Sequence, residues 1–171
     1  MIFQGFKETI LKKKFNKLLS QIEVNNVSPL KKIQTIGIIT SEEITSKIDL
    51  QKETEVLLGI RNVKIYSLRK FNKTDEISYK HFTNKDINWS GQFTQTNFKS
   101  FLEEPLDLLI GYFNTNNIFL ETAVLQSKAR FKVGFSATNS KLYQIEISEK
   151  TENVKAFTLE LKKYLQIIKK L

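Results

Sequence analysis

The chain has 171 residues, 40% of them hydrophobic, and a net charge of +9. Its length suits one domain, and its 13 phenylalanines supply apolar area for a core. With no cysteine and only one histidine, the sequence excludes disulfides and gives no basis for a thiolate or histidine-rich metal site. It contains no apolar run of signal-peptide or transmembrane length. We therefore expect a cytoplasmic protein without a membrane-spanning helix.

The positive charge is concentrated at the two ends of the chain. Residues 1–32 carry seven lysines against two glutamates, residues 150–171 carry six against two, and residues 33–149 are neutral. A neutral body with two basic ends favours a polyanion contact made by the terminal elements. Lysine outnumbers arginine 24 to 3, so an ordinary solvated lysine surface stays open as the alternative. The scarcity of arginine argues against sequence-specific binding of a nucleic acid, because the planar guanidinium group binds bidentately and the lysine ammonium group does not.

Residues 1–24 are predicted to form a basic helix that is an appendage on the domain. Its apolar side chains make two stripes at helical spacing. The first stripe is Leu11, Phe15, Leu18 and Ile22, and the second, rotated away from it, is Phe3, Phe6 and Ile10. We expect this helix to pack against the C-terminal helix. Residues 25–29 contain two asparagines, a serine and a proline, which predict a short linker.

Residues 30–150 alternate between strand and helix patterns and are predicted to form an α/β core. Helices are expected at 41–58, 96–104 and 118–129, and strands at 32–40, 62–69, 76–83, 106–113, 131–137 and 143–148. Thr40 and Glu43 have the spacing of a capping box at the start of the first of these helices, and Gly59 is expected to end it. Strand–helix–strand units with short joins predict right-handed parallel crossovers. We therefore predict one three-layer α/β domain over residues 1–171, with a mainly parallel sheet of five or six strands. Both faces of a parallel sheet are covered, so we expect five of its apolar residues to be buried: Ile36, Ile38, Leu108, Ile110 and Val133.

Residues 153–171 are predicted to form an amphipathic helix. Val154, Phe157, Leu161 and Leu165 line one side, and lysines line the other. Cations at the C-terminal end of a helix also gain ~0.3–1 kcal/mol each from the helix dipole. Because the two ends of the chain hold all of the net charge, we expect the terminal helices to touch or to share one face of the domain.

The motifs of common cofactor sites are missing from the sequence. All six glycines are isolated, whereas a loop that binds pyrophosphate needs clustered glycines. His81 is expected to be an ordinary strand histidine, because a general base needs an orienting partner that the sequence does not show. Trp89 is expected to cover an edge of the core, with a stacking platform for a base as the alternative. We expect no cofactor and no metal, and an enzyme is not favoured.

Three functions remain open. The first is a non-enzymatic, RNA- or ribosome-associated protein whose terminal helices bind phosphates through Lys12, Lys13, Lys14, Lys17, Lys162, Lys163, Lys169 and Lys170. The second is a small-ligand or enzymatic Rossmann-like domain with a site at the carboxyl ends of the strands, where polar side chains gather. These are Thr40, Ser41, Asn114, Thr115, Asn116 and Ser136. The third is a basic helix lying on an anionic membrane.

Two short motifs support resemblances to known families. Lys85, Asp86, Trp89 and Gly91 form K-D-x-x-W-x-G, and residues 128–134 form K-A-x-F-K-V-G. With them the chain resembles an uncharacterised family of Bacteroidota proteins of about this length, which implies a lineage and no activity. Residues 106–135 are also similar to one half of heptosyltransferase-type glycosyltransferases. That resemblance implies an α/β fold but no transferase activity, since Gly111 replaces a polar strand residue and a second Rossmann-like domain has no room.

Overall fold

The computed structural model describes residues 2–22, 31–76 and 79–171 and contains one six-stranded sheet. The strands are β1 (Ile36–Ser41), β2 (Val63–Leu68), β3 (His81–Phe82), β4 (Leu108–Tyr112), β5 (Lys132–Phe135) and β6 (Ile145–Ile147). All neighbouring strands are parallel, and their order is β3-β2-β1-β4-β5-β6. This is the order of doubly wound Rossmann-type sheets, which reverse direction of growth between β1 and β4. The predicted α/β class and parallel sheet are confirmed.

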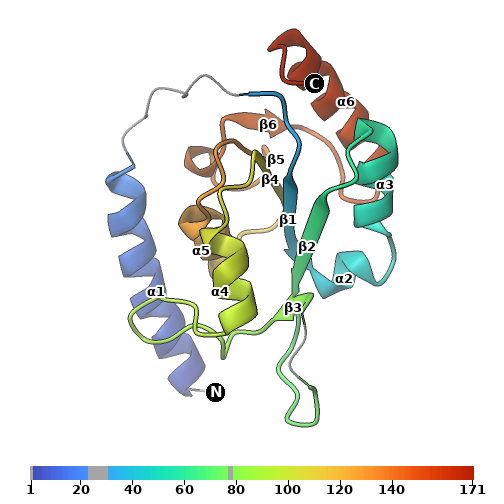
Figure 1. The fold of residues 1–171 in the computed structure, drawn as a ribbon. Coiled ribbons are helices and arrows are strands. Elements are labelled where there is room, and N and C mark those ends of the chain that lie inside the picture. The colour runs from blue at the N-terminus through green and yellow to red at the C-terminus, as the bar shows by residue number, and fades with distance from the viewer. Residues whose placement is uncertain (1, 23–30, 77–78) are drawn as a thin grey trace.

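Helices cover both faces of this sheet, which gives the predicted three layers (Figure 1). On one face lie α1 (Ile2–Ser20), α4 (Thr96–Glu103) and α5 (Ile118–Gln126). On the other lie α2 (Glu42–Thr45), α3 (Leu50–Leu58) and α6 (Val154–Ile167). A short 3₁₀ helix, η1 (Ser140–Leu142), precedes β6. Because both faces are covered, the central strands β1 and β4 are mostly apolar. The five predicted sheet residues are buried: Ile36, Ile38, Leu108, Ile110 and Val133.

The helix expected at 41–58 is two helices, and its expected capping box is absent. Ser41 rather than Thr40 precedes α2, and its side chain makes no capping hydrogen bond. Thr40 is buried, and its hydroxyl donates to the Tyr112 carbonyl at 2.7 Å. A second helix starts after Asp49, whose carboxylate accepts from Lys52 N. The local pattern therefore failed for two reasons. Thr40 bonds the neighbouring strand β4 instead of capping a helix, and Asp49 caps a second helix. Gly59 ends α3 in the left-handed region at φ 72°, as predicted.

The strand expected at 76–83 is shorter than predicted. β3 contains only His81 and Phe82, and residues 77 and 78 lie outside the described residues. It pairs with β2 only at Ser67 and Leu68. The outer edge of β2 from Val63 to Tyr66 therefore has no neighbouring strand in the described part of the chain.

The expectation that the terminal helices share a face is wrong. α1 buries Leu11, Phe15 and Leu19 in the core on the α5 side of the sheet. α6 buries its own apolar side in the core on the α3 side, so the sheet separates the two helices. Leu18 and Ile22 of the predicted first stripe are exposed, because the buried stripe of α1 includes Leu19 instead. The predicted linker at 25–29 lies outside the described residues.

Two glycines in neighbouring strands make room for a tyrosine ring. Gly111 of β4 pairs with Gly134 of β5, and a Cβ on either would overlap the side chain of Tyr143.

Lys132 of β5 also serves the packing of the domain. Its ammonium group donates to the carbonyls of Val124 and Leu125 at the end of α5, at 2.6 and 3.3 Å. Burial lowers the pKa of Lys132 to about 8. The second sequence motif is therefore explained by packing rather than by chemistry.

Replacing Gly134 by Ala should destabilise the fold by about 1–3 kcal/mol, the usual range for overpacking a core. The new methyl group would meet ring atoms of the buried Tyr143. Urea unfolding measures the change, and the cost should shrink when Tyr143→Leu is added, because the two sites are coupled. Gly5→Ala is the matched control, since nothing lies within 4 Å of its added Cβ. That helical, exposed position should gain about 0.5–1 kcal/mol. Equal effects at the two glycines would contradict this account.

Candidate functional site

The lysines of α1 differ in what their ammonium groups contact. Lys14 Nζ donates to the Trp89 carbonyl at 2.9 Å, and Lys7 Nζ donates to the Asn84 carbonyl at 3.0 Å. These contacts attach α1 to the loop between β3 and α4. Burial raises the pKa of Glu121 on α5, and the nearby ammonium group of Lys12 opposes this shift. Of the four predicted phosphate ligands on α1, Lys14 therefore has a structural contact, whereas three are exposed: Lys12, Lys13 and Lys17.

The predicted lysines of α6 divide in the same way. Lys162 Nζ donates to the Leu57 carbonyl at 2.9 Å, in the last turn of α3. A cation is favourable there, because the last carbonyls of a helix have no partner within the helix. Lys163 lies 3.7 Å from Glu160 in an exposed pair, which contributes little to stability. Lys169 and Lys170 lie just beyond the helix, where the chain turns.

The turn after α6 brings the two basic ends of the sequence together. Lys169 has a left-handed backbone with φ 57°, and Lys170 N donates back to the Leu165 carbonyl at 2.8 Å, as in a Schellman end. The carbonyl of Lys170 then accepts from Ile33 N at 2.9 Å. Lys31 and Lys32 immediately precede Ile33. The segment before β1 and the end of α6 are therefore neighbours, as Figure 1 also shows.

We call Lys31, Lys32, Lys169 and Lys170 the amino-edge cluster, because they lie at the edge of the sheet where the strands begin. Lys31, Lys32 and Lys169 are exposed, and Lys170 is half-buried. In the described part of the chain, no ion pair involves Lys31, Lys32 or Lys169. Lys31 and Lys32 were not among the predicted site residues. Their position next to the predicted linker gave no sign of the end of α6 nearby, which only the hydrogen bond from Ile33 N to the Lys170 carbonyl shows.

At the opposite edge, the structure brings together only part of the predicted ligand site. A cavity of about 170 Å³ lies beyond the carboxyl ends of β1 and β4, and Ser41, Asn114 and Thr115 are in its wall. Thr40 is buried against Tyr112 and does not face it. Asn116 and Ser136 are exposed and do not line it.

The charges around this cavity oppose an anionic ligand. Glu43 and Glu152 lie in its wall and outnumber the one cation there, Lys47. Glu42 and Glu43 occupy the first turn of α2, where a Rossmann domain would place a pyrophosphate. At the start of α5, the side chain of Asn117 already accepts from the N–H groups of Phe119 and Leu120. The site therefore resembles a Rossmann crevice in topology, but its residues do not fit a dinucleotide.

His81 has a partner that the sequence did not show. Its Nδ1 lies 2.6 Å from the hydroxyl oxygen of the buried Ser67, in the register pair of β2 and β3. Burial lowers the pKa of His81, with a further contribution from Arg69, whereas Glu42 acts in the opposite direction. A neutral imidazole can accept a hydrogen bond from the Ser67 hydroxyl at Nδ1. Ser67 and His81 both line a hollow of about 390 Å³ beside α3.

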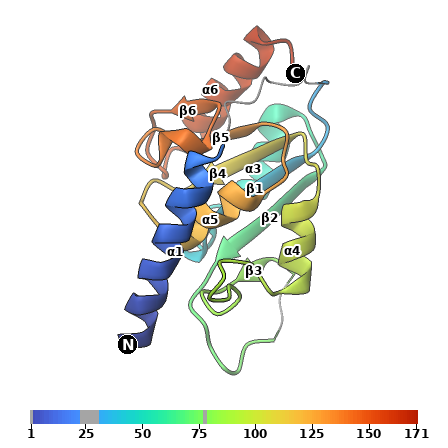
Figure 2. The same cartoon turned by 90° about the vertical axis from the view of Figure 1, so that its left-hand side faces the viewer.

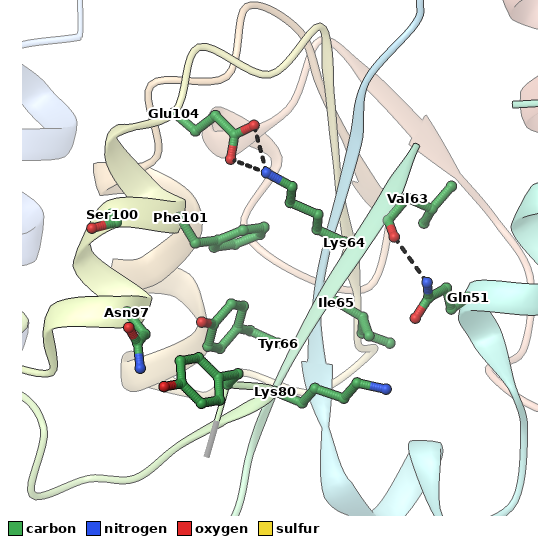
Figure 3. Close-up of a pocket in the computed structure, with 11 residues that line it drawn as sticks. Gln51, Val63, Lys64, Ile65, Tyr66, Lys80, Asn97, Ser100, Phe101 and Glu104 are labelled. Carbon is green, nitrogen blue, oxygen red and sulfur yellow. Dashed lines mark hydrogen bonds and ion pairs between the residues drawn. The ribbon is translucent and has the colours of Figure 1, made fainter. Parts of the chain in front are cut away.

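A second hollow, of about 410 Å³, runs along the open edge of β2 between α3 and α4 (Figure 3). Lys64 Nζ binds both carboxylate oxygens of Glu104 across one end, at 2.7 and 2.8 Å. Gln51 Nε2 donates to the Val63 carbonyl at 3.0 Å. These polar groups already have partners, and the remaining wall is largely apolar. No cluster of three or more metal-binding side chains occurs in residues 2–22, 31–76 and 79–171.

A comparison with known families gives one match. Residues 7–168 match the model of a family described as "Family of unknown function (DUF6913)". The chain belongs to that family. This confirms the expected membership of an uncharacterised family, while no curated protein and no solved structure matches. Membership assigns no activity. None of the described helices combines the length and the apolar character that a membrane crossing requires.

The partial burial of His81 predicts a pH-dependent loss of stability. The unfolded histidine has the ordinary pKa of 6.5, and the folded one has a lower pKa. Its contribution is therefore complete above the unfolded value and is lost as the pH falls, because the unfolded chain binds the proton more tightly. Between about pH 8 and about pH 5, wild type should lose more unfolding free energy than His81→Gln. Urea unfolding at each pH measures the free energy of unfolding. If it changes with pH equally in wild type and His81→Gln, the pKa of His81 is not lowered in the folded state.

Proposed function

We propose that the protein binds RNA through its phosphates and that the amino-edge cluster makes the principal contact. The observation that supports this most directly is the hydrogen bond from Ile33 N to the Lys170 carbonyl, which joins the two basic ends of the chain. Four lysines at one edge create a local positive potential. Phosphates dominate the affinity of such surfaces.

The type of cation points to phosphates rather than to bases. Lysine is a flexible point charge, whereas specific base readout relies on the planar fork of arginine. All four members of the cluster are lysines. We therefore propose binding without preference for base sequence. Free RNA and ribosomal RNA offer the same phosphates, and a comparison of structured ribosomal RNA with an unstructured oligonucleotide separates these two partners.

The exposed lysines of α1 form a separate surface. Lys12, Lys13 and Lys17 project from a helix that lies on the other side of the sheet from α6. An RNA that contacted both surfaces would have to pass around the domain. We therefore assign these three lysines a secondary role. We assign Lys14 and Lys162 a structural role instead, because their ammonium groups donate to backbone carbonyls of the domain.

The proposal predicts that Lys31→Gln, Lys32→Gln, Lys169→Gln and Lys170→Gln together weaken binding to a fluorescent oligo(U) RNA. Each phosphate contact steepens the salt dependence by ~0.7–0.9 log units of affinity per log unit of salt. The combined variant should therefore show a slope shallower by up to about three units. Anisotropy titrations over a series of salt concentrations measure both quantities.

A variant with equal charge loss elsewhere is the control. Lys52, Lys99, Lys128 and Lys141 are exposed and lie outside the amino-edge cluster. Their replacement by Gln lowers the net charge by the same amount and should change the slope much less. If both variants behave alike, the effect is one of net charge and the cluster is not the site. If wild type binds no RNA even at ~50 mM salt, the proposed function is wrong.

A second candidate function is the binding of a small ligand at the carboxyl-edge cavity. Its position supports this, because open α/β sheets bind ligands where the strand order reverses. Its volume of about 170 Å³ is below the ~300–1,000 Å³ typical of drug-sized ligands. Glu43 and Glu152 in its wall favour a compact cation, such as a small amine. Thermal-shift measurements with small amines, repeated on Glu43→Gln, test this function.

A further inference from the structure

Exposed apolar side chains gather at the amino-terminal end of α1. Ile2 is 89% exposed, Phe3 79%, Phe6 61% and Trp89 49%. The rings of Phe6 and Trp89 are in contact, with centroids 6.2 Å apart. We call these four residues the tip patch. Phe3 and Phe6 belong to the second apolar stripe of the helix. Apart from the contact of Phe6 with Trp89, these two side chains are exposed to solvent.

The loop that carries Trp89 is held by its own hydrogen bonds. The Asp86 carboxylate accepts from Thr83 N at 2.7 Å, and Gly91 N donates to the Asn88 carbonyl at 3.0 Å. Gly91 has φ 82°, which favours glycine. Asp86 and Gly91 of the first sequence motif therefore stabilise the conformation of this loop. The side chain of Trp89 packs against Phe6 but is still half-exposed, which leaves it accessible to a partner outside the domain.

The charge around the tip patch selects an anionic partner. α1 carries five lysines against Glu8 alone. Exposed apolar patches mark interaction sites. A helix that carries both exposed aromatic side chains and lysines is typical of segments that enter the membrane interface. We propose that the tip patch inserts into the interfacial region of an anionic membrane. Lys12, Lys13 and Lys17 remain in water and are attracted by the surface potential of the lipids.

The geometry favours a membrane over single-stranded RNA as the occupant. Ile2 offers no ring on which a base could stack, and the rings of Phe6 and Trp89 are inclined by 54°. The ammonium groups of Lys7 and Lys14 already bind loop carbonyls. The exposed cations begin at Lys12, about 13 Å along the helix from Phe3 at 1.5 Å per residue. A base stacked on Phe3 would therefore have no exposed lysine of α1 beside its own phosphate.

The tip patch is far from the amino-edge cluster. Figure 2 shows the amino-terminal end of α1 extending past the carboxyl ends of the strands, whereas the cluster lies at the opposite edge of the sheet. A protein attached to a membrane by its tip would keep that cluster open to a second partner. The inference therefore does not depend on the proposed RNA binding.

Trp89 is the only tryptophan in the chain, so its fluorescence reports on the tip patch directly. Vesicles of phosphatidylcholine with phosphatidylglycerol should shift its emission to shorter wavelength and should sediment with the protein. Vesicles of phosphatidylcholine alone should do so much less, since the attraction by anionic lipid is missing. The lipid-induced shift should persist in the variant that lacks the four lysines of the amino-edge cluster. Loss of the shift in that variant would assign vesicle binding to the other surface and overturn the inference.

Phe3→Gln with Phe6→Gln should reduce vesicle partitioning by about tenfold or more, because each phenyl group loses its transfer from water. The matched control is Val56→Gln with Ile167→Gln, which removes two exposed apolar side chains from α3 and α6. Thermal unfolding verifies that both variants fold. Three results overturn the inference: no spectral shift with anionic vesicles, quenching of Trp89 by single-stranded RNA without a vesicle effect, or a dimer that Phe3→Gln and Phe6→Gln dissociate.

Discussion

Burial of both faces of the central strands is the constraint on which the rest of the molecule depends. β1 and β4 lie between two other strands on each side, and their side chains are apolar in both directions. Each face therefore needs a cover of helices. α5 and α3 are too short to cover a six-stranded sheet alone, and the terminal helices complete the two layers. α1 is thus fixed on one face and α6 on the other.

This constraint places the lysines of the two terminal helices on different surfaces. The lysines of α1 and α6 cannot act as one surface, because a buried sheet lies between them. The segment that enters β1, however, passes the end of α6, and a single backbone hydrogen bond from Ile33 to Lys170 aligns the two. A positive surface therefore forms from two pairs of lysines that are distant in sequence. Its electrostatic potential arises from tertiary contact and not from a charged run.

The Rossmann-type order creates a crevice but not the usual ligand site. A pyrophosphate needs close approach to backbone N–H groups at a helix start. Here carboxylates occupy the first turn of α2, and the side chain of Asn117 occupies the start of α5. Within the sheet, Gly111 and Gly134 receive the ring of Tyr143 rather than a ligand. The shared topology thus carries no cofactor chemistry in these residues, which illustrates that function belongs to the site and not to the fold.

The sequence by itself determined the α/β class, the positions of most strands and helices, and the buried residues such as Ile38 and Leu108, because period and apolar content follow from local spacing. It also predicted Gly59 as a helix end. Tertiary structure alone decided which face each terminal helix covers, that Ile33 N donates to the Lys170 carbonyl, that Ser67 contacts His81, and that Thr40 bonds Tyr112 instead of capping a helix. These are contacts between distant segments, and amphipathic spacing does not specify the partner of an apolar stripe. The exposed Phe3 and Phe6 are an example, since their spacing indicated a buried face and only the packed structure left them in water.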